Sequence, residues 1–276
     1  MRVLNFILSH SIFIAFCAGA LVYQSYLLLN LPFRPEVFGL VFFATLAAYN
    51  TYWMLCKLNN DNKEKRPLTF SAYSGYFILF VASTIAVLDY LWQMPSFFPM
   101  VTIASILTFL YLLPVISSVK FRLGKNTGFI KTLLLAFTWS FFTVLIPAYG
   151  EIVSHLNQVM SLFFMRFFFM LMLCVIFDSR DVSIDKLRNL PSIATDFSKK
   201  TLTIIMMFVL GGYVLSLFGL HQFLGNSVYL FLLLIVGSLT FIIYLLALKT
   251  RGYYFYYFLV DGLMILSALS LYMATI

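Results

Sequence analysis

The stretch FFFMLMLCVIFDSRDVSIDK, residues 167–186, joins an unbroken apolar run to a cluster of acidic residues. Asp178, Asp181 and Asp185 are spaced three and four residues apart, so a helix would present all three on one face. The whole chain contains only 10 acidic residues, which makes three of them at one place informative. Carboxylates this close repel one another unless a positive charge lies among them. The stretch therefore predicts a hydrophobic helix that ends in a cation-binding site.

Mg²⁺ is the cation that this cluster favours. The ion takes oxygen ligands and is usually held by one or two carboxylates together with substrate phosphates. We therefore predict Asp178, Asp181 and Asp185 as catalytic and metal-binding residues that act on a phosphorylated substrate. The alternative is a solvated helix end that binds nothing and is neutralised by its basic neighbours. These neighbours are Arg180, Lys186 and Arg188.

The composition of the whole chain is that of an integral membrane protein. Of its 276 residues, 62% are hydrophobic and 10% are charged, whereas soluble domains are about a quarter charged. A helical span needs roughly 20 apolar residues, and lipid leaves open sheet edges unsatisfied. We predict an all-α polytopic protein, a single transmembrane domain over residues 1–276. Its nine spans are 4–29, 35–56, 69–91, 97–117, 130–148, 157–177, 201–220, 226–247 and 253–274.

The basic residues predict the orientation of these spans. Of the 18 lysines and arginines, all but Arg34 and Arg166 precede the first span or lie in, or at the edge of, the loops after spans 2, 4, 6 and 8. Because loops rich in Lys and Arg stay on the cytoplasmic side, the N-terminus and these four loops are expected there, in a cell or plasma membrane. The net charge of +8 then reflects topology and attraction to anionic lipid, and nucleic-acid binding is not expected.

Basic side chains near the acidic cluster are candidates for binding a substrate diphosphate. Charge-assisted hydrogen bonds from such side chains would hold phosphate oxygens that a metal leaves uncompensated. The alternative for each of them is the charge bias of cytoplasmic loops alone. The candidates in the loop after span 4 are Lys120, Arg122 and Lys125, with Asn126 as a further hydrogen-bond donor, and Arg66 closes the loop after span 2.

Two charged residues lie inside predicted spans, and charges there default to a functional hypothesis because they are costly in lipid. Arg166 and Asp261 lie about eight residues inside spans 6 and 9, and the sequence does not say whether they pair. The many aromatic residues are expected to be mostly lipid-facing or interfacial, including the cluster of Tyr253, Tyr254, Tyr256 and Tyr257. Three scattered cysteines without CxxC spacing predict neither a disulfide framework nor a zinc site.

The chain resembles the UbiA superfamily of intramembrane prenyltransferases, which has nine transmembrane helices and two aspartate-rich motifs. The second family motif, DxxDxxxD, matches Asp178, Asp181 and Asp185, and the following LRNLPSIATDFSKK is similar to the family's continuation. Residues 110–140, LYLLPVISSVKFRLGKNTGFIKTLLLAFTWS, resemble the family's stretch after helix 4.

The resemblance implies an isoprenyl transfer from a prenyl diphosphate to an aromatic or lipophilic acceptor, assisted by Mg²⁺. In the first family motif, NxxxDxxxD, Asn50 matches and is expected to help place the diphosphate, and Arg66 matches the closing basic residue. The two acid positions are occupied by Met54 and Leu58, which leaves one family metal without its carboxylates.

Two alternatives to the transferase remain open at this point. Met54 and Leu58 favour a non-catalytic relative that binds an isoprenoid lipid or a partner protein in the bilayer. Arg166 and Asp261 allow a transporter, although no inverted repeat or broken helix pair is visible in the sequence.

Overall fold

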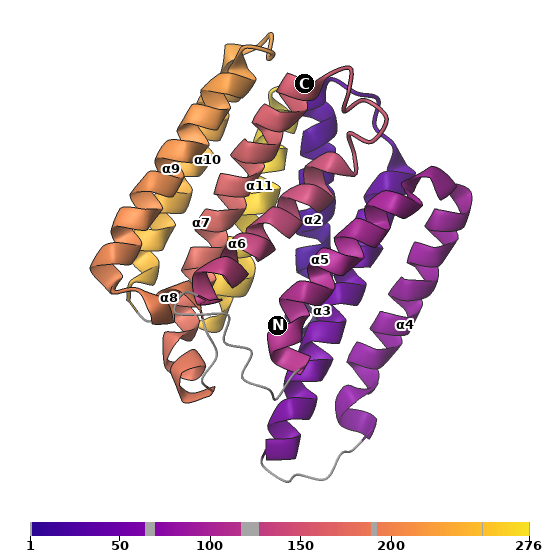
Figure 1. The fold of residues 1–276 in the computed structure, drawn as a ribbon, viewed down its shortest axis with the longest axis vertical. Coiled ribbons are helices and arrows are strands. Elements are labelled where there is room, and N and C mark those ends of the chain that lie inside the picture. The colour runs from indigo at the N-terminus through magenta and orange to yellow at the C-terminus, as the bar shows by residue number, and fades with distance from the viewer. Residues whose placement is uncertain (1, 64–69, 117–126, 189–191, 250, 276) are drawn as a thin grey trace. The chain divides into compact units, whose positions relative to one another are not determined.

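A computed structural model of the chain describes residues 2–63, 70–116, 127–188, 192–249 and 251–275. Within these residues every regular element is helical (Figure 1). Nine of the helices described there are long and apolar enough to cross a membrane, in agreement with the nine predicted spans. The chain is therefore a helical, multi-pass membrane protein.

The helices form two compact units. Unit 1 consists of Met1–Gly19 and Arg34–Phe121, and unit 2 of Ala20–Phe33 and Arg122–Ile276, so that α2 contributes to both. The single domain predicted over residues 1–276 stays a prediction.

In chain order the elements are α1 Arg2–Ser9, α2 Ile12–Leu29, α3 Pro35–Lys63, α4 Phe70–Gln93, η1 Pro95–Phe97, α5 Phe98–Ile116, α6 Thr127–Ser140, η2 Phe141–Leu145, α7 Leu156–Arg188, α8 Ile193–Asp196, α9 Lys199–His221, α10 Ser227–Ala247, η3 Phe255–Val260 and α11 Asp261–Met273.

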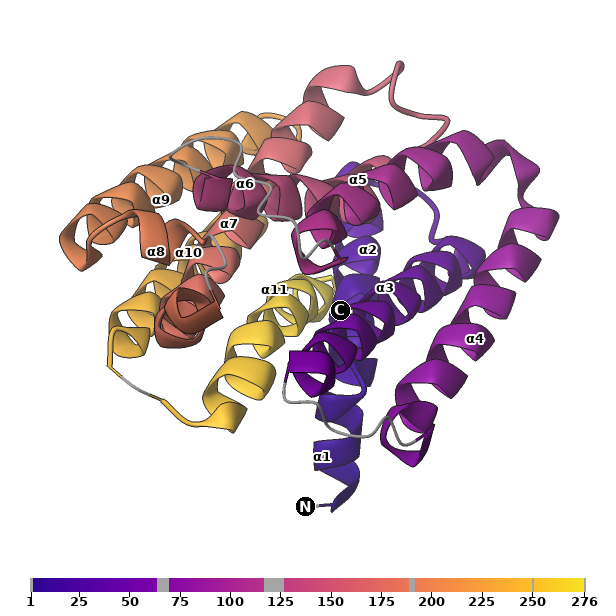
Figure 2. The ribbon, with the colours of Figure 1, turned by 60° about the horizontal axis from the view of Figure 1, so that its bottom comes forward.

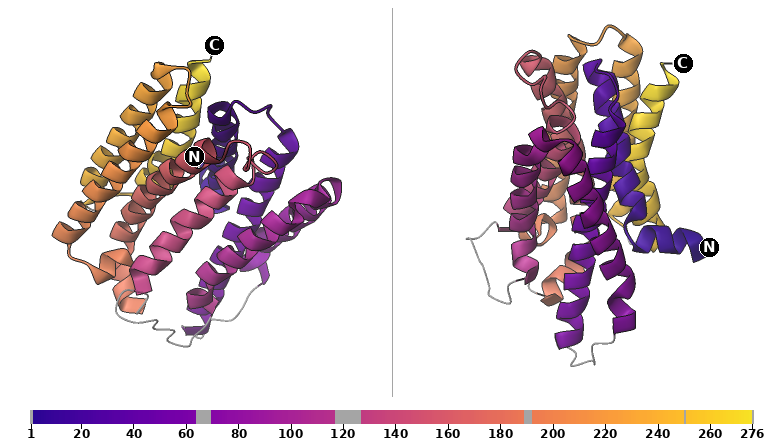
Figure 3. Two further views of the ribbon diagram at one scale, coloured as in Figure 1. Left: turned by 45° about the horizontal axis from the view of Figure 1, so that its top comes forward. Right: turned by 90° about the vertical axis from the view of Figure 1, so that its right-hand side faces the viewer.

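Unit 1 is organised around the neighbouring helices α3 and α4, which lie side by side along their length (Figures 1 and 3). Gly39 of α3 makes this approach possible, because a Cβ atom there would overlap the ring of Tyr90 on α4. Phe43, one turn further along α3, stacks on the same ring at a centroid distance of 6.2 Å. Helix α5 also packs against α3.

The first predicted span, 4–29, is wrong at its N-terminal end. The indigo helix α1 ends at Ser9 and bends away from α2, which begins at Ile12 (Figure 3, right). Ser11 between them has a φ angle of 63°, a left-handed conformation that an α-helix cannot contain. The break leaves the carbonyl group of His10 outside the helical ladder, and Asn50 of α3 donates a hydrogen bond to it at 3.1 Å.

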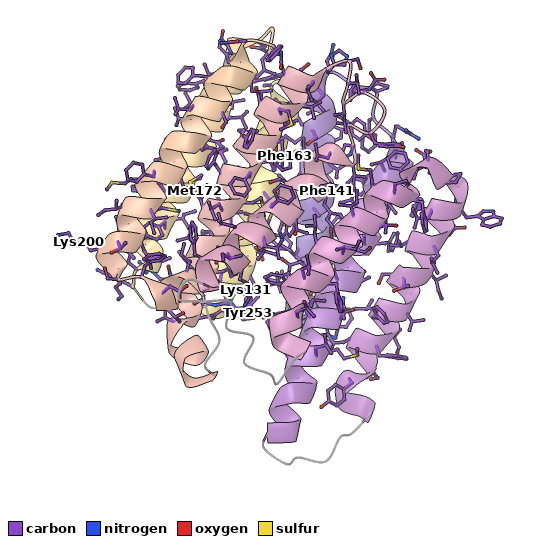
Figure 4. All side chains as sticks on the ribbon, viewed as in Figure 1. Lys131, Phe141, Phe163, Met172, Lys200 and Tyr253 are labelled. Atoms are coloured by element: carbon purple, nitrogen blue, oxygen red, sulfur yellow. The ribbon has the colours of Figure 1, made fainter. Side chains whose placement is uncertain are left out.

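Unit 2 is built around α7, whose 33 residues extend over roughly 50 Å at the usual helical rise. Helices α6, α9 and α10 pack against it, and α11 lies beside α10 (Figure 2). The apolar half of α7 is part of the core of unit 2, as Phe163 and Met172 illustrate (Figure 4). Two glycines allow close packing here: Gly212 of α9 admits the ring of Phe168, and Gly237 of α10 admits that of Tyr213.

Two π-helical segments, η2 and η3, interrupt the α-helical pattern of unit 2. Segments of this kind widen the helix by one residue and are frequent at functional sites. In η2 the carbonyl oxygen of Thr143 accepts a hydrogen bond from Ser25 of α2 at 2.6 Å. Segment η3 leads directly into α11 and carries Tyr256 and Tyr257, which face the predicted site described next.

Candidate functional site

The predicted acidic cluster lies on a continuous helix. Asp178, Asp181 and Asp185 all belong to α7, which continues past its membrane-spanning part to Arg188. The helical spacing expected from the sequence is therefore present in the backbone. The side chains of Asp178 and Asp181 are both partly exposed, and that of Asp185 lies outside the described residues.

Asp178 is tied to helix α6. The hydroxyl group of Thr132 donates a hydrogen bond to Asp178 Oδ2 at 2.6 Å, a length typical of a hydroxyl bound to an ionised carboxylate. Thr132 itself is 3% exposed. The contact fixes the position of one candidate metal ligand relative to the neighbouring helix.

Asp181 is paired with the arginine that precedes it. Arg180 Nε donates to Asp181 Oδ1 and Arg180 Nη2 to Asp181 Oδ2, each at 2.7 Å. This two-pronged geometry is the strongest arrangement available to an arginine and a carboxylate. Both oxygens of Asp181 are thus engaged by one guanidinium group, which is itself partly exposed, at 23%.

Three aromatic rings surround the guanidinium group of Arg180. Its Cζ atom lies 5.1 Å from the ring centroid of Phe177, 5.1 Å from that of Tyr256 and 4.8 Å from that of Tyr257. A guanidinium within about 6 Å of a ring face is attracted by the ring's quadrupole. The rings come from α7 and η3, so they hold Arg180 between the two elements.

The segment after α7 returns to the same end of unit 2. Asp196 at the end of α8 accepts a hydrogen bond from the backbone N–H of Phe129, in the first turn of α6, at 3.2 Å. Gly128 lies directly against the backbone of Ser192, where a Cβ atom would find no room. Lys131 of α6 and Tyr253 lie at this end of unit 2 as well (Figure 4).

Asp261, the first residue of α11, is also close to the site. Its side chain is 7% exposed, and it interacts electrostatically with Arg180. Arg180 is therefore hydrogen-bonded to Asp181 and interacts electrostatically with Asp261. Of the acids predicted as one cluster, Asp181 is paired with Arg180 and Asp178 with Thr132 in the described residues.

Asp178 and Asp181 fit a Mg²⁺ ion of a particular kind. No group of three His, Cys, Asp or Glu side chains is placed to hold a metal in the part of the chain that is described. A Mg²⁺ ion that takes the rest of its ligands from substrate phosphates and water needs only one or two carboxylates. Two partly exposed carboxylates at the end of a membrane helix meet this requirement. They do not by themselves form a site in which the protein supplies every metal ligand.

The predicted diphosphate-binding residues divide into one that is described and five that are not. Asn50, in unit 1, is fully buried, and its Nδ2 group donates to the carbonyl oxygens of His10 and Leu46. These two bonds use both of its amide hydrogens and support the break between α1 and α2. The residues outside the described ranges are Arg66, Lys120, Arg122, Lys125 and Asn126.

Arg166 is a separate charged feature, deep inside unit 2. It is 0% exposed, and its Nη2 atom donates to the carbonyl oxygen of Leu21 and to Ser25 Oγ, both at 3.3 Å. Within the described residues its Nε and Nη1 atoms have no hydrogen-bond partner. The two charged residues inside spans thus have different surroundings: the guanidinium of Arg166 contacts α2, while Asp261 lies near Arg180.

Sequence reasoning identified the acids of this site and named Arg180 among their neutralising neighbours, but it did not identify Thr132 or the rings around Arg180. Tyr256 was expected at the lipid interface, which is wrong: it is 2% exposed and packs against Arg180. Thr132 was not considered, and it lies 46 residues away from Asp178 along the chain. The available signal for Tyr256 was the density of tyrosines in residues 253–257.

Comparison with known proteins does not assign the chain to a family. No protein-family model, curated protein or solved structure matches it. The resemblance to the UbiA superfamily therefore depends on the motif residues alone and stays a prediction.

Proposed function

We propose that this protein is a membrane-embedded prenyltransferase that moves an isoprenyl group from a prenyl diphosphate to an aromatic or lipophilic acceptor. One observation carries the proposal: Asp178 and Asp181 are partly exposed at the end of a membrane-crossing helix, beside an arginine held by three aromatic rings. An apolar tail with a highly charged diphosphate head needs such a junction between a hydrophobic and a charged environment.

In this proposal the residues of the chain bind and orient the diphosphate head. Asp178 and Asp181 would hold Mg²⁺, and Thr132 keeps Asp178 in position. The bound ion supplies neutralisation of the charge that develops on the leaving diphosphate. The bond between the allylic carbon and the diphosphate oxygen breaks, and the diphosphate leaves with the electron pair. The acceptor then forms a new bond to that carbon and loses a proton.

The test is the consumption of prenyl diphosphates of several chain lengths by the purified protein in lipid, with native lipid extract as the source of acceptor. We expect diphosphate release that depends on Mg²⁺ and that falls by more than about 100-fold in Asp178→Asn and Asp181→Asn, because both remove a proposed metal ligand. The matched control is Asp89→Asn on α4, an exposed carboxylate that accepts only a local bond from Gln93. Release that continues without Mg²⁺ or in both variants would contradict the proposal.

A second candidate is a non-catalytic protein that binds a prenyl diphosphate or a related lipid. The engagement of both Asp181 oxygens by Arg180 favours it, as do Met54 and Leu58 at the first-motif acid positions. Binding of the same compounds without release of diphosphate, for any acceptor supplied, would select this candidate over the transferase.

A further inference from the structure

Arg180 and a metal ion would compete for the same two atoms. The Asp181 oxygens that the proposed function assigns to Mg²⁺ accept hydrogen bonds from Arg180 at 2.7 Å each. These bonds take one lone pair on each oxygen, so a metal would have to use the remaining lone pairs or open one of the bonds. Binding of a metal at the lone pairs that Arg180 occupies includes the displacement of Arg180.

A displaced Arg180 would not be free to leave the site. Its guanidinium remains attracted to the rings of Phe177, Tyr256 and Tyr257. It also interacts electrostatically with Asp261. Each of these contacts is separate from the bonds to Asp181. The three rings thus keep the guanidinium of Arg180 beside Asp181 while Asp181 exchanges this partner for the metal.

A diphosphate is the natural new partner for the released guanidinium. Arginine has a planar set of donors that matches phosphate oxygens as well as it matches a carboxylate. A phosphate bound to a metal at Asp181 would lie next to the position that Arg180 already occupies. In the exchange the metal takes over the neutralisation of Asp181, and the arginine offsets one of the negative charges of the diphosphate.

We propose that Arg180 is an exchangeable counter-ion, which neutralises Asp181 in the empty site and passes to the substrate diphosphate when Mg²⁺ takes its place. This role rests on the proposed function, because it requires that the site bind Mg²⁺ and a diphosphate. It assigns to Arg180 the positioning of the diphosphate head and explains why an arginine directly precedes a metal-binding aspartate.

The proposal predicts that removal of Arg180 changes the affinity for the metal and the affinity for the diphosphate in opposite directions. Mn²⁺ serves as a spectroscopic probe of the Mg²⁺ site, and inorganic pyrophosphate with saturating Mg²⁺ as a probe of the diphosphate site. For Arg180→Gln in the full chain, we expect Mn²⁺ to bind about tenfold more tightly, because a competing charged hydrogen-bond pair is gone. We expect pyrophosphate to bind about tenfold or more weakly, because its arginine partner is gone.

Two further variants make the result decisive. Arg180→Lys keeps the charge but not the two-pronged geometry, so both changes should keep their signs and become smaller. It also provides the measurement if Arg180→Gln does not fold. Arg34→Gln is the matched control, since Arg34 is likewise stacked on a ring, that of Phe97 at 5.3 Å, and belongs to unit 1. It should leave both affinities unchanged.

The possible failures are distinguishable. If both affinities fall together in the Arg180 variants, or if neither changes, Arg180 only supports the local structure and the exchange is disproved. If the unaltered protein binds neither Mn²⁺ nor pyrophosphate, the proposed function itself fails, and the exchange fails with it.

Discussion

At the scale of single residues, Arg166 is the side chain whose surroundings match its chemistry least. Its guanidinium group is fully buried, has two 3.3 Å hydrogen bonds to neutral acceptors, and leaves Nε and Nη1 without partners. Removing an ion from water costs several kcal/mol, whereas a hydrogen bond to a charged group returns about 1.5–3 kcal/mol. Two such bonds return about 3–6 kcal/mol, which roughly offsets that cost, and the unpaired Nε and Nη1 atoms then make Arg166 a net cost to the fold.

We therefore expect Arg166→Met to raise the thermal stability of the purified protein, by about 1–4 kcal/mol, since an apolar side chain of similar length would fill the same space. A thermal melt in detergent or lipid measures the change. Arg34→Met, which alters an exposed arginine, should bring no such gain. A large loss of stability would show instead that the bonds from Arg166 to Leu21 and Ser25 of α2 outweigh the burial of its charge.

The residue scale also shows where sequence reasoning stopped. Spacing alone placed Asp178 and Asp181 on one helix, because helical periodicity is a local property. Their partners, Thr132 and Tyr256, come from elements far along the chain, and no local pattern states which side chains will meet. The neighbour Arg180 was visible, but only the folded site reveals that it engages both oxygens of Asp181.

At the scale of elements, two adjacent glycines of α9 test how this helix packs against α7. A Cβ atom at Gly212 would lie 2.6 Å from the ring of Phe168, while a Cβ atom at Gly211 has nothing within 4 Å. Both positions are inside the helix, so alanine removes the same backbone freedom at each. The difference between the two substitutions therefore reports the packing contact.

We expect Gly212→Ala to destabilise the protein by about 1–3 kcal/mol, because Phe168 must move to admit the methyl group. Gly211→Ala should stabilise it by about 0.5–1 kcal/mol through its effect on helix propensity alone. Thermal melts of the two variants in the same lipid provide the comparison. Equal effects of the two substitutions would contradict the close approach of α7 and α9 at this position.

The elements themselves were largely predictable, and their interruptions were less so. Nine apolar stretches of sufficient length predicted nine spans, because lipid permits few alternatives to a helix. No Gly or Pro at Ser11 predicts the break there, which is supported by a hydrogen bond from Asn50 of another helix. The π-helical turn η2 has a sign in the sequence, since Pro147 has no N–H to donate to the carbonyl of Thr143, whereas no such residue marks η3.

At the scale of the whole molecule, the sequence predicts more than the structure tests. The number of spans and the helical class are borne out among the described residues. Orientation in the membrane depends on the distribution of basic residues between loops. Several basic residues on which both the orientation and the diphosphate site depend, Lys120, Arg122 and Lys125 among them, lie outside the described ranges.

The orientation can be tested within unit 2 by two single cysteines, after replacement of Cys17, Cys56 and Cys174 by serine. Val153, before α7, is 92% exposed, and Lys200, at the start of α9, is exposed and extends away from the helices (Figure 4). The charge bias places Lys200 in the cytoplasm, and one spanning helix, α7, separates the two positions. In intact cells a membrane-impermeant maleimide should label Val153→Cys and spare Lys200→Cys, and inside-out vesicles should give the reverse. The opposite pattern would place the proposed diphosphate site on the outer face, where a cytoplasmic prenyl diphosphate could not reach it.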